Sequence, residues 1–196
     1  SKEKFKFKEN LSETIRLKGT SPNSLFSLAF KGVRIGEKDG FVLDILSSIL
    51  GDGESSYLNQ KYVLGKKSML QNVYAANYTL QESGTFFIGG QLSDKTSIKK
   101  WKKVISRDLK SVCDRVVTPR AMEKVINQYL VSVLKDLDTT AGVARYLGDR
   151  EVYFGSYEFY KKEFSIYRNI KAEDVVNACK KYLNVDDALF ISIGKY

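Results

Sequence analysis

Two glycines and two serines follow one another closely at residues 51–56, in the order Gly-Asp-Gly-Glu-Ser-Ser. A glycine turn that leads into a helix presents backbone N–H groups, and the start of a helix favours a carboxylate or a phosphate. The stretch lacks the Lys-Ser/Thr ending of a P-loop and does not match G-x-G-x-x-G. From the residues alone, Gly51, Asp52, Gly53, Ser55 and Ser56 are therefore either a joint between two helices or a loop that contacts a ligand.

Other catalytic groups find little support in the sequence. The chain contains no histidine, so it has no Ser-His or Cys-His dyad and no His-ligated zinc. Ser97 and Lys100 match S-x-x-K, but the S-D-N and K-T-G elements of Ser-Lys acylases do not occur. Cys113 and Cys179 fall at apolar helical positions and are interpreted as buried thiols. A disulfide between them is the alternative, so the compartment, cytoplasmic or periplasmic, stays open.

The chain is basic, with 32 Lys and Arg against 23 Asp and Glu and a net charge of +9. This raises the hypothesis of a nucleic-acid-binding domain. The lysines, however, gather only in short patches at residues 2–8, 99–103 and 161–162, and such patches are usually solvated faces. We therefore expect no nucleic-acid partner. No apolar run approaches the roughly 18 residues of a membrane span. We therefore also expect no membrane-spanning segment.

The 196 residues fit one domain. We interpret residues 1–10 as an arm or linker and residues 11–196 as a single domain. Periodicity predicts strands at residues 13–17, 25–30, 73–80, 85–92 and 188–193, and helices at 38–50, 55–63, 94–116, 118–137 and 172–182. A further helical stretch is predicted at 138–169, with an interruption near Gly155 and Ser156. Because strands and helices are grouped rather than alternating, the fold class is α+β: one mixed, mostly antiparallel sheet with helices packed on one face.

Several local features fix the expected element ends. Gly51 directly follows an apolar helix, where a left-handed cap favours glycine. Asp94 is the expected N-cap of the next long helix, and Thr118 with Pro119 begins another. The nearly continuous apolar run at residues 25–30 is typical of a central strand that is covered on both faces.

The order of these motifs resembles a known family. Leu50 to Leu58 is similar to the Leu-Gly-Gly-Gly-x-Ser-Ser-Arg-Leu segment of insulinase/pitrilysin-type zinc peptidases, which include the mitochondrial processing peptidases. The resemblance covers about residue 11 to the C-terminus. Further similar segments lie at residues 38–41, 73–78, 83–86, 118–123 and 171–175.

The resemblance implies a role for the whole chain. Members of the family pair two similar α+β domains, of which only one carries the inverted zinc motif H-x-x-E-H. A chain without histidine resembles the metal-free, C-terminal-type half of such a zinc metalloendopeptidase. That half holds no cofactor, closes the peptide-binding chamber and contacts extended peptide. The zinc is expected in a homologous domain of the same polypeptide or in a companion subunit.

The family's metal-free half can donate an Arg and a Tyr, seven positions apart, just before the hairpin. Carried over onto this sequence, those positions are Leu64 and Gln71, which cannot replace them. Lys67 and Tyr74 have the right separation but lie three residues out of register. The resemblance therefore implies no catalytic residue in this chain, which alone is not an enzyme. It leaves the glycine loop as the substrate-facing feature. The alternative is a degenerate, inactive scaffold or binding subunit.

Overall fold

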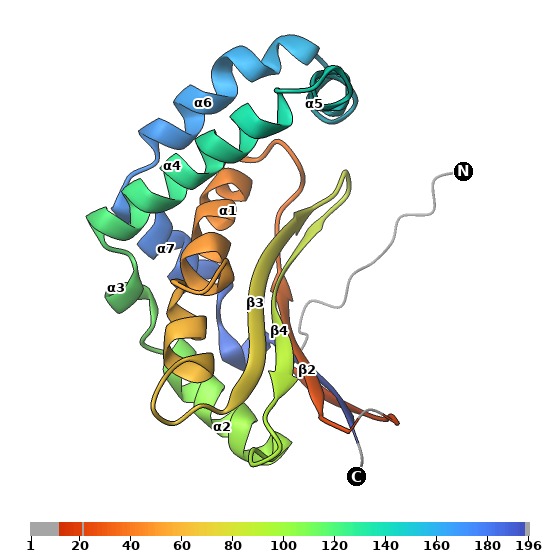
Figure 1. Ribbon diagram of the computed structural model, residues 1–196, viewed down its shortest axis with the longest axis vertical. Coiled ribbons are helices and arrows are strands. Elements are labelled where there is room, and N and C mark those ends of the chain that lie inside the picture. Colours follow the sequence, from red (N-terminus) through yellow and green to blue (C-terminus); the bar gives the residue numbers. More distant parts are fainter. Residues whose placement is uncertain (1–11, 21, 195–196) are drawn as a thin grey trace.

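The described strands form one five-stranded sheet, and the helices lie on one of its faces (Figure 1). The computed structural model describes residues 12–20 and 22–194. The strand order is β1-β5-β2-β4-β3, in which β1 and β5 run parallel and the other neighbours antiparallel. The strands are β1 (Glu13–Lys18), β2 (Leu25–Lys31), β3 (Leu70–Thr79), β4 (Gly84–Leu92) and β5 (Leu189–Gly194). The predicted fold class is confirmed.

The helices form two layers over the sheet, with α1 next to the strands and α4 and α6 outside it (Figure 1). The predicted arm at residues 1–10 lies outside the described residues. The α-helices are α1 (Lys38–Gly51), α2 (Ile98–Leu109), α3 (Cys113–Val116), α4 (Pro119–Asp136), α5 (Thr140–Phe154), α6 (Tyr160–Asn169) and α7 (Ala172–Tyr182). Short helical turns are η1 (Asn59–Val63, a π-helix), η2 (Tyr157–Phe159) and η3 (Val185–Asp187).

Alternation along the strands sends the largest apolar side chains toward the helices. Phe26, Leu28 and Phe30 of β2 are each less than 5% exposed. Phe26 packs against Trp101 of α2, with ring centroids 5.1 Å apart. The intervening side chains of β2 are only partly buried or exposed. The prediction of a central strand was right, but the described helices cover only one of its faces.

The opposite face of the sheet is not covered by any described helix (Figure 1), and the strand register places mostly apolar residues on it. Residues paired directly across strands point to the same side, so the register defines this surface, which we call the open face. One row of paired residues runs Leu17, Ile193, Leu25. Another ends at Tyr74, which pairs with Gly89. The large exposed side chains of the open face are Leu17, Leu25, Tyr74 and Tyr78, each between 39% and 57% exposed.

Gly51 is the last residue of α1 and is not in the left-handed conformation, so its predicted role as a left-handed cap was wrong. Its positive-φ neighbour is Gly53, at φ 71°. What requires glycine at position 51 is close packing: a Cβ there would lie 2.1 Å from the backbone N of Ala75 in β3. The end of α1 therefore rests directly on the sheet backbone.

The long helix predicted over residues 94–116 is divided. It begins after Ser97, whose Oγ accepts from the N–H of Lys100, and not after Asp94. It ends at Leu109 and resumes as the short α3. At the break, the guanidinium of Arg115 donates to the backbone oxygens of Ser111 and Asp108. These side-chain hydrogen bonds satisfy carbonyls that a continuous helix would bond internally. Thr118 caps α4 as predicted.

Cys113 and Cys179 form a disulfide between α3 and α7, with Cα atoms 5.6 Å apart. The prediction of two buried thiols was therefore wrong. Burial itself was right, since the two residues are 7% and 0% exposed. Helical position placed each cysteine in the core, but only the packing of α7 beside α3 shows that they meet. Sequence separation alone carries no such information.

Replacement of Gly51 by Ala tests the contact between α1 and β3. The added Cβ would meet backbone atoms, which cannot rotate away, so we expect a loss of about 1–3 kcal/mol in the free energy of unfolding. Gly148 in α5 is the control, because a Cβ there meets nothing within 4 Å. Gly148→Ala should be neutral or stabilise by up to about 1 kcal/mol. Equal effects in denaturant titration would contradict the packing.

The disulfide has a direct chemical test. Titration of the unreduced protein in guanidinium chloride should detect no free thiol, whereas two thiols per chain would contradict the bond. The double replacement Cys113→Ala with Cys179→Ala should lower the free energy of unfolding by about 2–4 kcal/mol, since the bond closes a long loop of the unfolded chain. Denaturant titration measures that difference.

Candidate functional site

The glycine loop joins α1 to the helical turn η1. Gly51 and Ser56 are buried, and the residues between them are exposed. The Oγ of Ser56 donates to the backbone carbonyl of Gly53 at 2.7 Å and accepts from the side-chain amide of Asn59. Asn59 also donates to the carbonyl of Val73 in β3. Ser56 thus fastens the loop to the sheet, which leaves Asp52, Gly53 and Ser55 as the predicted residues that reach solvent.

The exposed end of the loop borders a hollow of about 290 Å³ between α1 and α4. In this hollow, the Oγ of Ser55 accepts a hydrogen bond from the ammonium of Lys124. Arg120, Ser48 and Thr118 also line it, and no acidic side chain of the described residues does. Positive charge and hydroxyl groups in one hollow attract a carboxylate or another anion. The positive charge beside the loop comes from side chains of α4, whereas the sequence had directed attention to the loop backbone.

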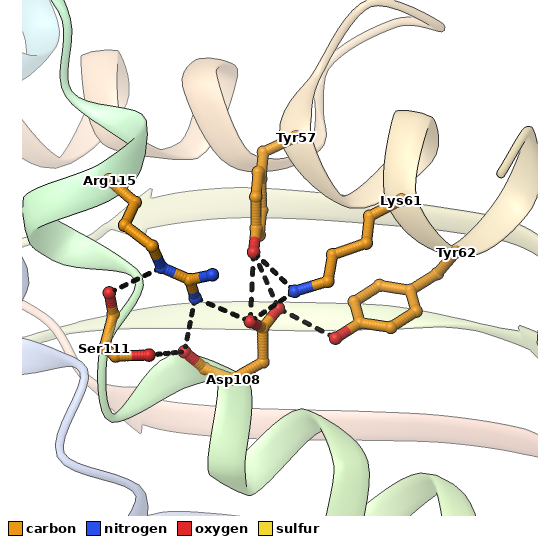
Figure 2. Close-up of polar contacts among 6 residues, drawn as sticks. All are labelled: Tyr57, Lys61, Tyr62, Asp108, Ser111 and Arg115. Atoms are coloured by element: carbon orange, nitrogen blue, oxygen red, sulfur yellow. Dashed lines mark hydrogen bonds and ion pairs between the residues drawn. The ribbon is translucent and has the colours of Figure 1, made fainter.

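Directly beyond the loop, the carboxylate of Asp108 gathers four donors (Figure 2). Asp108 lies at the end of α2 and is 8% exposed. Its oxygens accept from Tyr57 at 3.0 Å and 3.1 Å and from Tyr62 at 2.8 Å. Lys61 and Arg115 approach it at 2.5 Å and 2.7 Å. We call these five residues the Asp108 cluster.

The electrostatics of the Asp108 cluster favour the ionised carboxylate. Burial opposes ionisation of Asp108, but the hydrogen bonds from Lys61, Arg115 and the two tyrosines outweigh it and lower its pKa below 3.8. Burial and the hydrogen bond to Asp108 raise the pKa of Tyr62. All donors are thus engaged by one carboxylate. The cluster joins η1, α2 and α3 rigidly, and it offers no free nucleophile or general base.

The positions carried over from the family lie apart from this cluster. Leu64 and Gln71 are exposed and make no contact that could replace an Arg or a Tyr. Lys67 is exposed in the segment between η1 and β3. Tyr74 lies on the open face, with its ring edge-on to Phe87 at 5.7 Å. It crosses Gly89, where a Cβ would lie 2.6 Å from the tyrosine hydroxyl.

Metal chemistry has no evident place in the described residues. Among them, no group of three or more His, Cys, Asp or Glu side chains could hold a metal ion. Within the same residues, no helix is both long and apolar enough to cross a membrane.

The sequence analysis missed the Asp108 cluster. A signal was present, because Asp108 falls seven residues after Trp101 and between Ile105 and Leu109, on the buried stripe of α2. A carboxylate at a core position requires donors. The sequence could not say that those donors come from η1 and α3.

Replacement of Asp108 by Asn tests the cluster. At neutral pH we expect a loss of about 1–3 kcal/mol in the free energy of unfolding, because Lys61 and Arg115 lose their partner but can return to water. A carboxyl with a lowered folded pKa stabilises above its unfolded pKa, and that stabilisation fades as the pH falls. The difference between variant and parent should thus be constant above about pH 5 and shrink below pH 3.8. A difference that grows in acid would contradict the assignment.

Comparison with known proteins addresses the family directly. Residues 1–129 match the model of the peptidase M16 inactive domain. The zinc protease PqqE of Helicobacter pylori is 24% identical over 159 residues, which are 80% of this chain and 35% of that protein. The chain thus spans about a third of the length of this curated relative.

Solved structures share the fold. A protease from Helicobacter pylori superposes with a TM-score of 0.82 at 19% identity, over 92% of this chain and 43% of that chain. A peptidase M16 inactive domain from Pseudomonas fluorescens gives a TM-score of 0.77 at 21% identity, over 93% and 43% of the two chains. The inferred resemblance to insulinase-type peptidases is confirmed, and the chain belongs to the peptidase M16 family as a domain of its inactive, C-terminal type.

Proposed function

We propose that this domain is the non-catalytic half of a zinc metalloendopeptidase, in which it closes the peptide-binding chamber and contacts extended peptide. Membership of the inactive-domain family carries the proposal. The composition supports it as well, because the chain has no histidine. The zinc ligands and the general base then belong to a homologous domain in the same polypeptide or in a companion subunit.

The open face is the surface that we assign to that zinc-bearing domain. Tyr78 stacks on Phe87 at 5.3 Å, and Tyr74 meets the same ring from the other side. Exposed aromatic side chains gathered on one surface mark a contact with another protein. The face lies opposite the helices (Figure 1). Burial of its apolar rows would give the two domains a contact without disturbing the helical layer.

Two features are suited to extended peptide. Among the described residues, β3 pairs with no strand other than β4. Beyond Val73, whose carbonyl already accepts from Asn59, its other edge offers backbone N–H and C=O groups to an added strand. The exposed part of the glycine loop, Asp52, Gly53 and Ser55, stands beside the hollow that Arg120 and Lys124 line. We propose that these loop residues contact the peptide there and that the hollow takes an acidic group of it.

The second candidate is an inactive scaffold or binding subunit beside an active peptidase. It is favoured by Leu64 and Gln71, which stand where the family can place an Arg and a Tyr and which cannot take over their chemistry. The two candidates differ in one measurable respect: a chamber-closing half raises the cleavage rate of its zinc-bearing partner, whereas a scaffold binds that partner without doing so.

We further propose that the domain matures in an oxidising compartment such as the periplasm, because disulfides persist there and not in the cytosol. The disulfide between Cys113 and Cys179 is the supporting observation. Alkylation of thiols in intact source cells before lysis, followed by mass measurement, should find both cysteines unmodified. Two alkylated cysteines would contradict this location.

Reconstitution tests the proposed function. The partner is the H-x-x-E-H domain that the proposal assigns to the same polypeptide or to a companion subunit, and the readout is cleavage of a quenched fluorescent peptide. Alone, this chain should bind no stoichiometric zinc and cleave nothing. Its addition should raise the cleavage rate of the zinc-bearing domain by at least about tenfold, because a closed chamber holds the peptide in place. Binding without acceleration would favour the scaffold, and stoichiometric zinc in this chain would contradict both candidates.

A matched pair of variants places the contact. Tyr74→Glu with Tyr78→Glu puts two charges on the open face and should weaken association with the zinc-bearing domain by at least about tenfold. The control is Tyr153→Glu with Tyr157→Glu, in α5 and η2, where the side chains are 49% and 53% exposed. The control should change the dissociation constant less than about twofold. Equal effects would contradict the assigned face.

A further inference from the structure

Two adjoining hollows form a groove between strand β1 and helix α2. Their volumes are about 290 Å³ and 330 Å³. Both are lined by Thr14, Lys102, Ser106 and Phe190, so they lie side by side. We call them together the β1–α2 groove. It lies on the helix-covered side of the sheet, away from the open face, and none of the residues assigned to peptide contact above belongs to it.

The charge of the groove is concentrated at one end. Among the described residues, the hollow nearer the start of α2 is lined by Arg16, Lys99, Lys102 and Lys103, and by no acidic side chain. At the other end, Asp186 pairs with Lys110 at 3.1 Å, and Glu13 is a second carboxylate in the lining. The positive charge of the first hollow is therefore not balanced by any described carboxylate in the same lining. Such a concentration of charge attracts an anionic ligand.

The floor of the groove is apolar and closed. Phe190 is 1% exposed and Ile98 is 9% exposed. The ammonium of Lys102 lies 5.4 Å from the ring centroid of Phe190 and donates to Thr14. A single-stranded nucleic acid needs aromatic rings on which its bases can stack. Among the described residues that line this groove, no such ring is accessible, so the chemistry of the groove favours an anion of a different class.

The edge of the sheet beside the groove suits a peptide. Among the described residues, β1 pairs only with β5, so its other edge carries backbone donors and acceptors for a further strand. By alternation, Thr14 and Arg16 face α2, on the same side as buried Phe190 and Ser192. A strand added at this edge would send every second side chain toward the lysines of α2.

We propose that the β1–α2 groove binds an acidic peptide segment, which adds as a strand to the edge of β1 that no described strand covers. Its alternate Asp or Glu side chains lie against Arg16, Lys99 and Lys103. Backbone hydrogen bonds to β1 hold the segment, and the cations select its sequence. The proposal stands on the groove and the edge alone, and it would survive the failure of the peptidase assignment.

Fluorescence anisotropy with a nine-residue peptide that alternates Glu and Val tests the proposal. Lys99→Glu with Lys103→Glu should weaken binding by at least about tenfold, since two attractive charge pairs become repulsive. The control is Lys135→Glu with Lys162→Glu, which changes the net charge equally at exposed positions of α4 and α6. We expect less than about a twofold effect from the control. Equal losses would overturn the proposal, because binding would then follow net charge alone.

Two further probes separate strand addition from general attraction. A peptide with the same residues in separate Glu and Val blocks should bind at least about fivefold more weakly, because its carboxylates cannot all face α2. Of two peptides N-methylated at either the Glu or the Val amides, at least one should lose about tenfold, because strand addition uses alternate amides. Unchanged affinity for all three, or tighter binding of a nine-nucleotide oligothymidylate, would overturn the proposal.

Discussion

The position of helix α1 between the sheet and the outer helices is the constraint on which the rest of the structure depends. Ten of its 14 residues are buried. One side meets β3 so closely at Gly51 that no Cβ fits. Polar side chains fix the other contacts: Asp44 accepts from Asn77 of β3 and from Tyr167 of α6, and Asp39 accepts from Tyr182 of α7. Burial raises the pKa of Asp44, and the hydrogen bonds that it accepts from Asn77 and Tyr167, two uncharged donors, oppose that rise.

Because α1 and its neighbours occupy one side, the sheet is left with an apolar face that these helices do not cover. In an isolated domain such a face exposes Tyr74 and Tyr78 to water at a cost in solubility. The account of function follows from this asymmetry. This domain of the inactive M16 type covers 35% of one relative and 43% of another, and the open face is the surface that we propose for contact with a second domain. On the other side of the sheet, the disulfide joins α3 to α7, and the Asp108 cluster joins η1, α2 and α3.

Periodicity and punctuation were enough to predict most of the fold. The helix over 172–182 and the cap at Thr118 agree with the structure. The failures have one physical origin. Gly51, Cys113 and Asp108 each take their role from a contact with an element far away in the sequence. The local sequence pattern shows the type of such a residue and whether it falls on a buried side of a helix. It cannot show which distant residue the fold brings into contact with it. The sequence analysis treated the glycine loop as one unit. In the structure, Gly51 and Ser56 are buried and hold it against the sheet, whereas the residues between them are exposed.

Hydroxyl-radical footprinting of tyrosine side chains tests the central claim most directly. In the free domain Tyr74, Tyr78, Tyr153 and Tyr157 are between 48% and 57% exposed, so they should be oxidised at similar rates. With the zinc-bearing domain added, the account predicts protection of Tyr74 and Tyr78 on the open face and unchanged rates at the other two. Protection of Tyr153 and Tyr157 instead, or of none of the four, would contradict it.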